Sequence, residues 1–181
     1  MKITVVCDVL GKENNGVTIA AMNLIRYLKE AGHEVKVLCA DASKKDTEGF
    51  YVVPNRDFGV FNAYLEKNGV TLASPEREII ESAIDGADVI HIMLPFSLGQ
   101  ATAKIAEEKK IPTAAGFHLL AENFSTHIFM SKSRLVNHLT YEHFRNMYKR
   151  VDAIHYVSQY LRDVYEGMYG ATNGYVISNG V

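Results

Sequence analysis

The sequence has few of the features that identify the class of a protein on their own. Its 181 residues carry a formal net charge of −2, so the charge balance gives no sign of a nucleic-acid partner. There are only two cysteines, Cys7 and Cys39, and each ends an apolar run. They lack the close spacing of a metal site or a redox pair, so we interpret them as small core residues in a reducing compartment.

Long apolar runs are also missing. No stretch is long enough to cross a bilayer, and Asp8 interrupts the first apolar run too early for a signal peptide. These two absences predict a cytoplasmic protein. The length and an ordinary hydrophobic content of 48% are enough for one compact domain.

Several catalytic signatures are absent as well. There is no G-x-G-x-x-G, which weakens a dinucleotide-binding interpretation, and no G-x-S-x-G nucleophile turn. Gly11 and Gly16 are spaced as in a P-loop, and Thr18 fits its last position, but Val17 stands where that loop needs Lys, so this interpretation fails. No group of His, Cys, Asp and Glu has the spacing of a metal site, so we expect no metal.

What the sequence does contain is a repeated alternation of short apolar strands and amphipathic helices. Residues 3–7 form a continuous apolar run closed by an acid, as in a parallel strand buried on both faces. Repeated strand–helix units predict an α/β fold, a Rossmann-like parallel sheet with helices on both faces and residues 3–7 near its middle. The predicted strands are 3–7, 34–39, 51–53, 89–93, 113–116, 153–157 and 175–178.

The predicted helices lie between these strands. One begins near Val17 and ends before Gly32, the usual residue after a helix. Ser74 has the residue type of a helix cap and is followed by a proline. Ser97 is a second candidate cap, ahead of a helix expected over 101–110. Further helices are expected over 58–68, 132–150 and 161–169.

In a parallel α/β sheet, ligands bind outside the carboxyl ends of the strands. His118 lies just past the strand 113–116, where its ring could hydrogen-bond a hydroxyl or a phosphate, but a histidine bonded to a loop carbonyl fits the spacing equally well. Glu122 and Asn123 follow with groups suited to sugar hydroxyls, although Asn123 could instead cap a helix. Gly16 would let a ligand approach the backbone, but alone it favours a tight turn.

Two further patterns favour ordinary structural roles. His91 lies among aliphatic residues in the strand 89–93, which is more typical of a satisfied core histidine than of a ligand. The basic stretch over 132–150 could bind an anionic membrane surface. Its interleaved apolar residues favour an amphipathic helix with a solvated basic face.

Several short segments form a further pattern when they are taken in chain order. They are Asn15-Gly16-Val17, Gly32-His33-Glu34-Val35, Asp88-Val89-Ile90-His91, Pro95-Phe96-Ser97-Leu98-Gly99, Gly116-Phe117-His118 and Ser178-Asn179-Gly180-Val181. Together they resemble the N-terminal domain of glycosyltransferase family 4, whose members have the GT-B fold, over nearly the whole chain. Two departures stand out: Asn15 occupies the place of a second glycine, and Ser178 that of a proline in the closing motif.

The resemblance implies that residues 1–181 are a single Rossmann-like N-terminal domain of a retaining glycosyltransferase. The donor-binding C-terminal domain would be absent, so we expect no turnover from these residues alone. The implied partners are a nucleotide-sugar donor and an acceptor glycan, lipid or metabolite, with no metal cofactor and no nucleic acid. The implied location is the cytoplasm, extending to weak peripheral contact with the inner face of the membrane.

The resemblance also implies roles for individual residues. His118 would be the catalytic residue beside the transferred sugar. Gly16 and Val17 would contact the donor, with the Gly16 N–H approaching its phosphate. Glu122 and Asn123 would supply polar substrate contacts.

Two other classes stay open at this point. One is a Rossmann-type nucleotide-binding oxidoreductase, which the missing G-x-G-x-x-G disfavours. The other is a non-catalytic α/β binding module, such as a receiver-like domain. Asp8 at the first strand end permits it, and the lack of further acids beside Asp8 weakens it.

Overall fold

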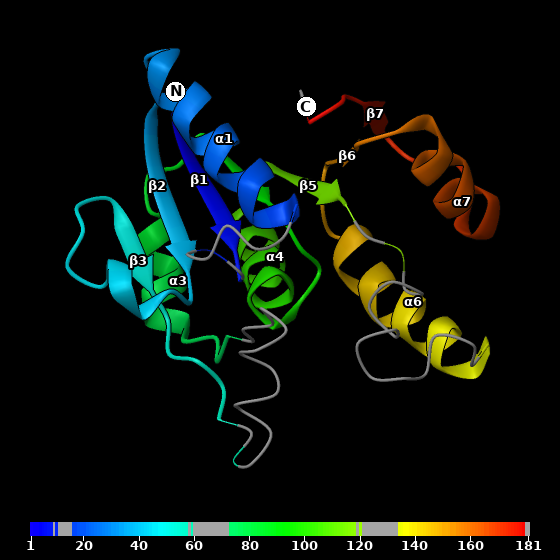
Figure 1. The fold of residues 1–181 in the computed structure, drawn as a ribbon, viewed down its shortest axis with the longest axis horizontal. Helices are drawn as coiled ribbons and strands as arrows, with labels where there is room; N and C mark the ends of the chain where they lie inside the picture. Colours follow the sequence, from blue (N-terminus) through cyan, green and yellow to red (C-terminus); the bar gives the residue numbers. More distant parts are fainter. Residues whose placement is uncertain are drawn as a thin grey trace.

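A computed structural model of the protein describes residues 1–8, 10, 16–57, 59, 73–118, 120 and 134–179 (Figure 1). Strands and helices alternate along this part of the chain. The elements are β1 (Lys2–Cys7), α1 (Gly16–Glu30), β2 (Glu34–Cys39), the 3-10 helix η1 (Ala42–Lys44), β3 (Phe50–Val52), α3 (Arg77–Ile84), β4 (Val89–Ile92), α4 (Ser97–Lys109), β5 (Thr113–Phe117), α6 (Arg134–Tyr148), β6 (Ala153–Tyr156), α7 (Gln159–Tyr169) and β7 (Gly174–Val176).

The seven strands form one sheet in the order β3-β2-β1-β4-β5-β6-β7. Every pair of neighbouring strands in it is parallel. β1 lies between β2 and β4, so the predicted parallel sheet with residues 3–7 near its middle is confirmed. All seven strands therefore present their carboxyl ends at the same edge, where ligands of such sheets bind.

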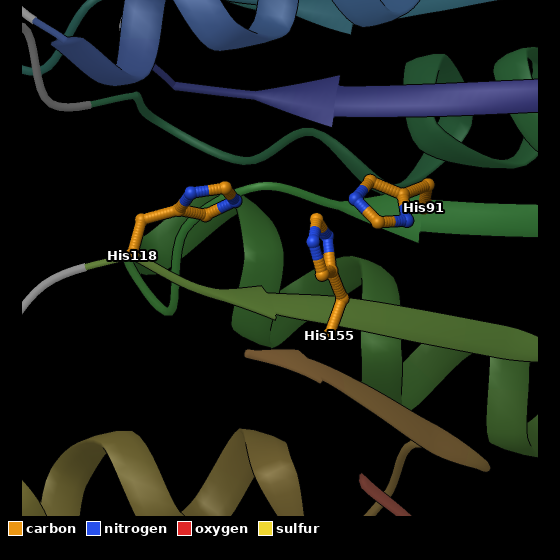
Figure 2. Close-up of side chains that lie close together, drawn as sticks. All are labelled: His91, His118 and His155. Atoms are coloured by element: carbon orange, nitrogen blue, oxygen red, sulfur yellow. The ribbon is translucent and has the colours of Figure 1, made fainter. Parts of the chain in front are cut away.

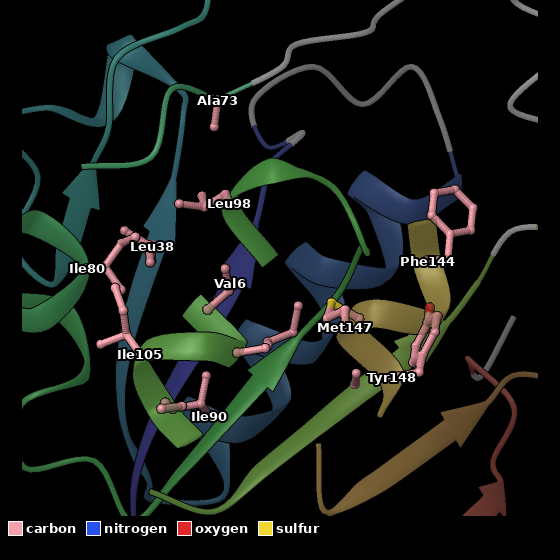
Figure 3. Packing of buried hydrophobic residues seen from close by; sticks show 14 of the residues in the cluster. Val6, Leu38, Ala73, Ile80, Ile90, Leu98, Ile105, Phe144, Met147 and Tyr148 are labelled. Atoms are coloured by element: carbon pink, nitrogen blue, oxygen red, sulfur yellow. The ribbon is translucent and has the colours of Figure 1, made fainter. Parts of the chain in front are cut away.

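Helices cover both faces of the sheet, as predicted. On one face, α1 packs Ala21 and Ile25 against β1 and β2. On the other face, α3, α4, α6 and α7 bury a larger core against Val6 and Ile90 (Figure 3). These two faces are called the α1 face and the α4 face below.

Two helix starts differ from the predictions. α3 begins at Arg77, with Glu76 as its N-cap and no side-chain capping bond, so the prediction that Ser74 caps it is wrong. The backbone before the helix is held extended by an antiparallel bridge between Asn55 and Ala73 and by the Ser74 N–H, which donates to Pro54. The helix expected over 58–68 lies almost entirely outside the described residues.

The start of α4 depends on a residue from β1. The helix begins at Ser97, one turn earlier than predicted. The Ser97 hydroxyl does not cap the helix; it donates to the Ala73 carbonyl at 2.7 Å. The cap comes from Asp8, whose Oδ1 accepts from the Leu98 N–H at 3.2 Å. Asp8 is buried, and its Oδ2 has no hydrogen-bond partner among the described residues. Burial raises the pKa of its carboxyl from 3.8 to about 7, against the lowering effect of the backbone N–H of Leu98.

The two cysteines are core residues, as predicted. Cys7 and Cys39 are fully buried and are register partners at the carboxyl ends of β1 and β2. Neither cysteine forms a disulfide bond. Burial raises the pKa of the Cys39 thiol to about 11, so it stays protonated at neutral pH.

Gly99→Ala tests how closely α4 approaches the sheet. A Cβ at residue 99 would lie 2.1 Å from the Leu94 carbonyl oxygen and 2.9 Å from a methyl carbon of Ile92. We expect a loss of about 3 kcal/mol in the free energy of unfolding, because the backbone must move to relieve the overlap. Gly167→Ala, within α7, is the matched control: nothing lies within 4 Å of its Cβ, so it should gain up to about 1 kcal/mol. Equal effects in urea denaturation would refute the close-packing argument.

Asp8→Asn tests the buried carboxyl. Since its folded pKa of about 7 exceeds the unfolded value of 3.8, its contribution to stability is complete below pH 4 and is lost as the pH rises through 7. The variant can still accept from Leu98 but does not ionise. At pH 8 it should be more stable than the wild type by about 1.4 kcal/mol for each unit of pKa shift, and the advantage should shrink toward pH 4. Parallel stability curves for the two proteins between pH 4 and 8 would show that Asp8 is not the titrating group.

Candidate functional site at the carboxyl ends of β4, β5 and β6

Three histidines from neighbouring strands converge on the α1 face of the sheet (Figure 2). His91 belongs to β4, His155 to β6, and His118 follows β5 directly. His91 is a register partner of Val5, which packs in the core beneath α1. On β5, Gly116 pairs with His155. Because alternate residues of a strand share a face, Gly116, His118 and both partner histidines lie on the same side of the sheet.

Gly116 makes room for the His118 ring. A Cβ at residue 116 would lie 2.1 Å from His118 Nε2 and 2.5 Å from its Cδ2. The imidazole therefore folds back over β5, into space that any other residue at position 116 would fill. This gives a physical reason for the glycine in the Gly116-Phe117-His118 segment, which sequence reasoning had not supplied.

The backbone that carries His118 is held from the α4 face. The buried Tyr148 hydroxyl donates to the Gly116 carbonyl at 2.9 Å. The ring of Phe117 is fully buried, with its centroid 5.4 Å from that of Tyr148, 5.7 Å from Tyr156 and 5.1 Å from Tyr165. His118 thus follows directly on a residue fixed by an aromatic cluster, which is the support that a binding side chain needs.

The three imidazoles are close to one another, with His155 between the other two. Its ring centroid lies 5.9 Å from that of His91 and 5.7 Å from that of His118. One ring nitrogen from each histidine can be chosen so that all three atoms lie within 4.8 Å of one another. Among the described residues this is the group of histidines, cysteines and acids with the spacing of a metal site.

Three of the six ring nitrogens in this cluster are buried and have no hydrogen-bond partner in the described part of the chain. Both nitrogens of His118 and Nε2 of His91 are buried and unpartnered. His118 therefore does not bond a loop carbonyl of the described residues, which was the structural alternative. The prediction that His91 is a satisfied core histidine is wrong for its Nε2. His155 differs, because its Nε2 lies 2.7 Å from the Ile177 carbonyl, to which it donates.

Burial keeps two of the rings neutral. It lowers the pKa of His118 to about 4, helped by the nearby His155. It lowers the pKa of His91 to about 3, with smaller effects of His155 and His118. Both rings are therefore uncharged at pH 7, unlike the near-neutral titration expected from the sequence. A neutral imidazole offers one N–H donor and one lone pair, so the cluster can bond hydroxyls or bind a metal ion.

The other predicted site residues lie elsewhere or are not described. Gly16 begins α1 and is exposed, and nothing lies within 4 Å of its Cβ position, so packing does not require a glycine there. Val17 packs partly against the α1-face core. Both follow β1, which is separated from β5 by β4. Glu122 and Asn123 lie outside the described residues.

A pocket of about 230 Å³ lies on the α4 face, between α6, α7 and β6. It is lined by tyrosines and by polar groups such as Arg145 and Asn173. None of the predicted site residues that the structure describes borders it. The three histidines and this pocket therefore lie on opposite faces of the sheet.

The basic stretch forms α6 and the residues just after it, and two of its cations, Arg145 and Arg150, are engaged within the protein. Arg145 lies 3.5 Å from Glu142 and 4.7 Å from the centre of the Tyr169 ring. Arg150 pairs with Glu107. Tyr141 and Phe144 bury the apolar side of α6 in the α4-face core. This arrangement agrees with an amphipathic helix. In the described ranges, no helix combines the length and the hydropathy that a membrane span requires.

The histidine cluster was not predicted, although the sequence contained a signal for it. His91 and His155 lie within predicted strands, His118 lies just past the end of another, and those three strands follow one another in the chain. Local spacing could not reveal the cluster because its members are far apart in sequence. Adjacency of the three strands, together with a shared face, was the missing step.

Comparison with known proteins gives a consistent family signal. The family model described as Glycosyltransferase Family 4 matches residues 14–181. A GDP-mannose-dependent alpha-mannosyltransferase of Corynebacterium glutamicum is 28% identical over 130 residues, which are 69% of this chain and 31% of the relative. The chain thus spans about a third of that relative's length.

Solved structures with the same fold cover almost the whole chain. The UDP-GlcNAc 2-epimerase from Methanocaldococcus jannaschii superposes with a TM-score of 0.56 at 11% identity, over 98% of this chain and 45% of the epimerase. An alpha-glucosyltransferase in complex with UDP and a 13-mer DNA gives 0.53 at 15% identity, over 100% of this chain and 43% of that one. At such identities the likeness shows the fold, and the predicted Rossmann-like half of a GT-B architecture is confirmed.

Gly116→Ala tests the placement of His118. The added methyl group occupies the space of the ring, so we expect His118 to swing toward solvent while the sheet stays folded. The pKa of His118, about 4 in the wild type because of burial, should rise toward the 6.5 of an exposed histidine. NMR titration of the metal-free protein measures this pKa. An unchanged His118 titration in a folded variant would show that the ring does not rest over Gly116.

Proposed function

Because this chain belongs to Glycosyltransferase Family 4, we propose that the full-length protein transfers a sugar from a nucleotide-sugar donor to an acceptor with retention of configuration. The observation that carries the proposal is His118: a neutral, partly buried imidazole at the ligand-binding edge of the sheet, whose two buried nitrogens have no partner among the described residues. The name of the Corynebacterium relative makes GDP-mannose the first donor to test.

Residues 1–181 are proposed to form one domain of a longer enzyme. The chain spans 31% of the mannosyltransferase and less than half of the structures that share its fold, which supports this division. The groups that bind most of the nucleotide would then belong to a second domain. Closure of a cleft between the two domains would bring the donor to the carboxyl edge of the sheet.

His118 is proposed to donate its N–H to a hydroxyl of the transferred sugar. The site excludes water from both ring nitrogens, and a hydrogen bond is stronger in such surroundings than in bulk water. The hydrogen bond from Tyr148 to Gly116 and the aromatic cluster around Phe117 hold the backbone that carries His118 in place before the substrate arrives. A preorganised donor of this kind stabilises the transition state more than the bound ground state.

The other proposed substrate contacts come from the start of α1 and from two polar residues that follow His118 in the sequence. Gly16 begins α1, and the N-terminus of a helix favours a negatively charged phosphate. Val17 would flank that contact, and Glu122 and Asn123 would supply polar contacts to substrate hydroxyls. In this scheme no divalent ion bridges the donor phosphates, so we propose that transfer needs no added Mg²⁺.

The acceptor is proposed to be a glycan, a lipid or a small metabolite in the cytoplasm. Contact with the inner face of the membrane would be weak and peripheral, since the described arginines at the end of α6 pair with acids of the protein itself. No nucleic-acid partner is proposed, because the net charge of −2 offers no extended basic surface.

The two alternative classes receive no support. The family match covers residues 14–181 and does not favour an oxidoreductase. A receiver-like module would use an accessible acid at the end of the first strand. Asp8 is instead buried and caps α4 through the Leu98 N–H.

His118→Ala in the full-length protein should lower kcat for sugar transfer about a hundredfold, the scale of losing one preorganised donor. His118→Gln should recover part of this loss, because its amide can donate a hydrogen bond. The melting temperature should change little, since His118 forms no hydrogen bond with the described residues. Steady-state kinetics and thermal unfolding on the same preparations provide both readouts.

His138→Ala, an exposed histidine on α6, is the control and should keep full activity. A His118→Ala enzyme with normal kcat and a much lower melting temperature would assign His118 a structural role instead.

A further inference from the structure

We propose that His91, His118 and His155 form a three-imidazole site that binds Zn²⁺. The site is built from side chains of three neighbouring strands (Figure 2). The proposal does not depend on the glycosyl-transfer proposal, because it concerns metal binding by these residues in the absence of any sugar.

The distances suit a transition ion after a small closure of the rings. One nitrogen of each histidine lies within 4.8 Å of the other two. A tetrahedral zinc ion with Zn–N bonds of about 2.0–2.1 Å places its nitrogen ligands about 3.4 Å apart. Figure 2 shows the three rings pointing toward one another from strands in parallel register. Rotation of the side chains can therefore bring the nitrogens from 4.8 Å to the closer spacing without a shift of the strands.

The hydrogen bonds leave lone pairs available for an ion. His155 donates its Nε2–H to the Ile177 carbonyl at 2.7 Å, so the lone pair of the neutral ring is on Nδ1. A second ring nitrogen bonded to a backbone carbonyl is the usual arrangement of a metal-binding histidine. His91 Nε2 and both His118 nitrogens have no partner among the described residues. Leaving a buried polar group without a partner costs free energy, and a bound ion would offset that cost.

The protonation states also suit a metal. Burial keeps His91 and His118 neutral at pH 7, so an ion need not displace a proton from either ring. Among the described residues no acid belongs to the group, so three neutral nitrogens alone would leave the charge of the ion uncompensated. A three-histidine zinc site accommodates that charge by holding water or hydroxide in its open fourth position.

The donor set selects among ions. Imidazole nitrogens favour zinc, cobalt, nickel and copper, whereas Mg²⁺ prefers oxygen ligands in octahedral geometry. The three-histidine site would therefore not hold a magnesium ion of the kind that bridges the phosphates of a nucleotide-sugar donor. Zinc on one nitrogen of His118 also leaves the other nitrogen as an N–H donor, so metal binding and a sugar contact can coexist.

Titration of the chelator-treated chain with Co²⁺ at pH 7.5 tests the proposal, because four- and five-coordinate cobalt absorbs visible light much more strongly than the six-coordinate ion. We expect one equivalent to bind with intense visible bands and Zn²⁺ to displace it. Calorimetry then gives the zinc affinity. His91→Ala, His118→Ala and His155→Ala should each weaken binding about a hundredfold or more, since even losing a group that only orients a ligand costs 10–100-fold.

His33→Ala is the matched control. His33 Nδ1 lies 3.5 Å from the N-terminal amine, so that pair is the alternative place for an ion, and its loss should leave the affinity unchanged. Circular dichroism confirms folding of each variant, and His155→Ala and His118→Ala decide the matter if His91→Ala does not fold. Wild-type affinity in those two variants, loss of binding in His33→Ala, a weak six-coordinate cobalt spectrum, or no binding by the wild type would each overturn the proposal. The last result would leave ordered water as the partner of these rings.

Discussion

The site depends on how the peptide at Gly116 is held. On the α4 face, the Tyr148 hydroxyl fixes its carbonyl and the aromatic cluster around Phe117 anchors the next residue. On the α1 face, the missing Cβ lets His118 fold back toward His155. The parallel register of β4, β5 and β6 then brings His91 to the same place. One strand thus divides its alternate residues between a packed core and a polar site.

The architecture was predictable from the sequence because a buried parallel sheet has a strong local signal. The apolar run 3–7 and the apolar residues Val35, Val37 and Leu38 within 34–39, separated by an amphipathic helix, predicted strands in a parallel arrangement. The start of α4 was not predictable in this way, because its cap is Asp8, 90 residues away in sequence. The start of α3 was displaced by the Asn55–Ala73 bridge, another long-range contact.

The site could be predicted only one residue at a time. The position of His118 past a strand end follows from the chain order, but its neutral state and its missing partners depend on burial. His91 appeared to be a core residue because its sequence neighbours are aliphatic; its spatial neighbours are two other imidazoles. Local patterns describe what lies beside a residue along the chain. Function here depends on what lies beside it across the sheet.

The two buried cysteines on β1 and β2 can serve as a probe of how the sheet opens. Cys7 and Cys39 are fully buried, and the raised pKa of Cys39 leaves almost none of it as the reactive thiolate. A thiol reagent added to the native protein can reach them only when the sheet opens between its central strands. Their rate of modification therefore reports the opening of β1 and β2 directly, without any introduced label. The chain contains no tryptophan, so these two sulfur atoms supply the intrinsic probe of folding that tryptophan fluorescence provides in other proteins.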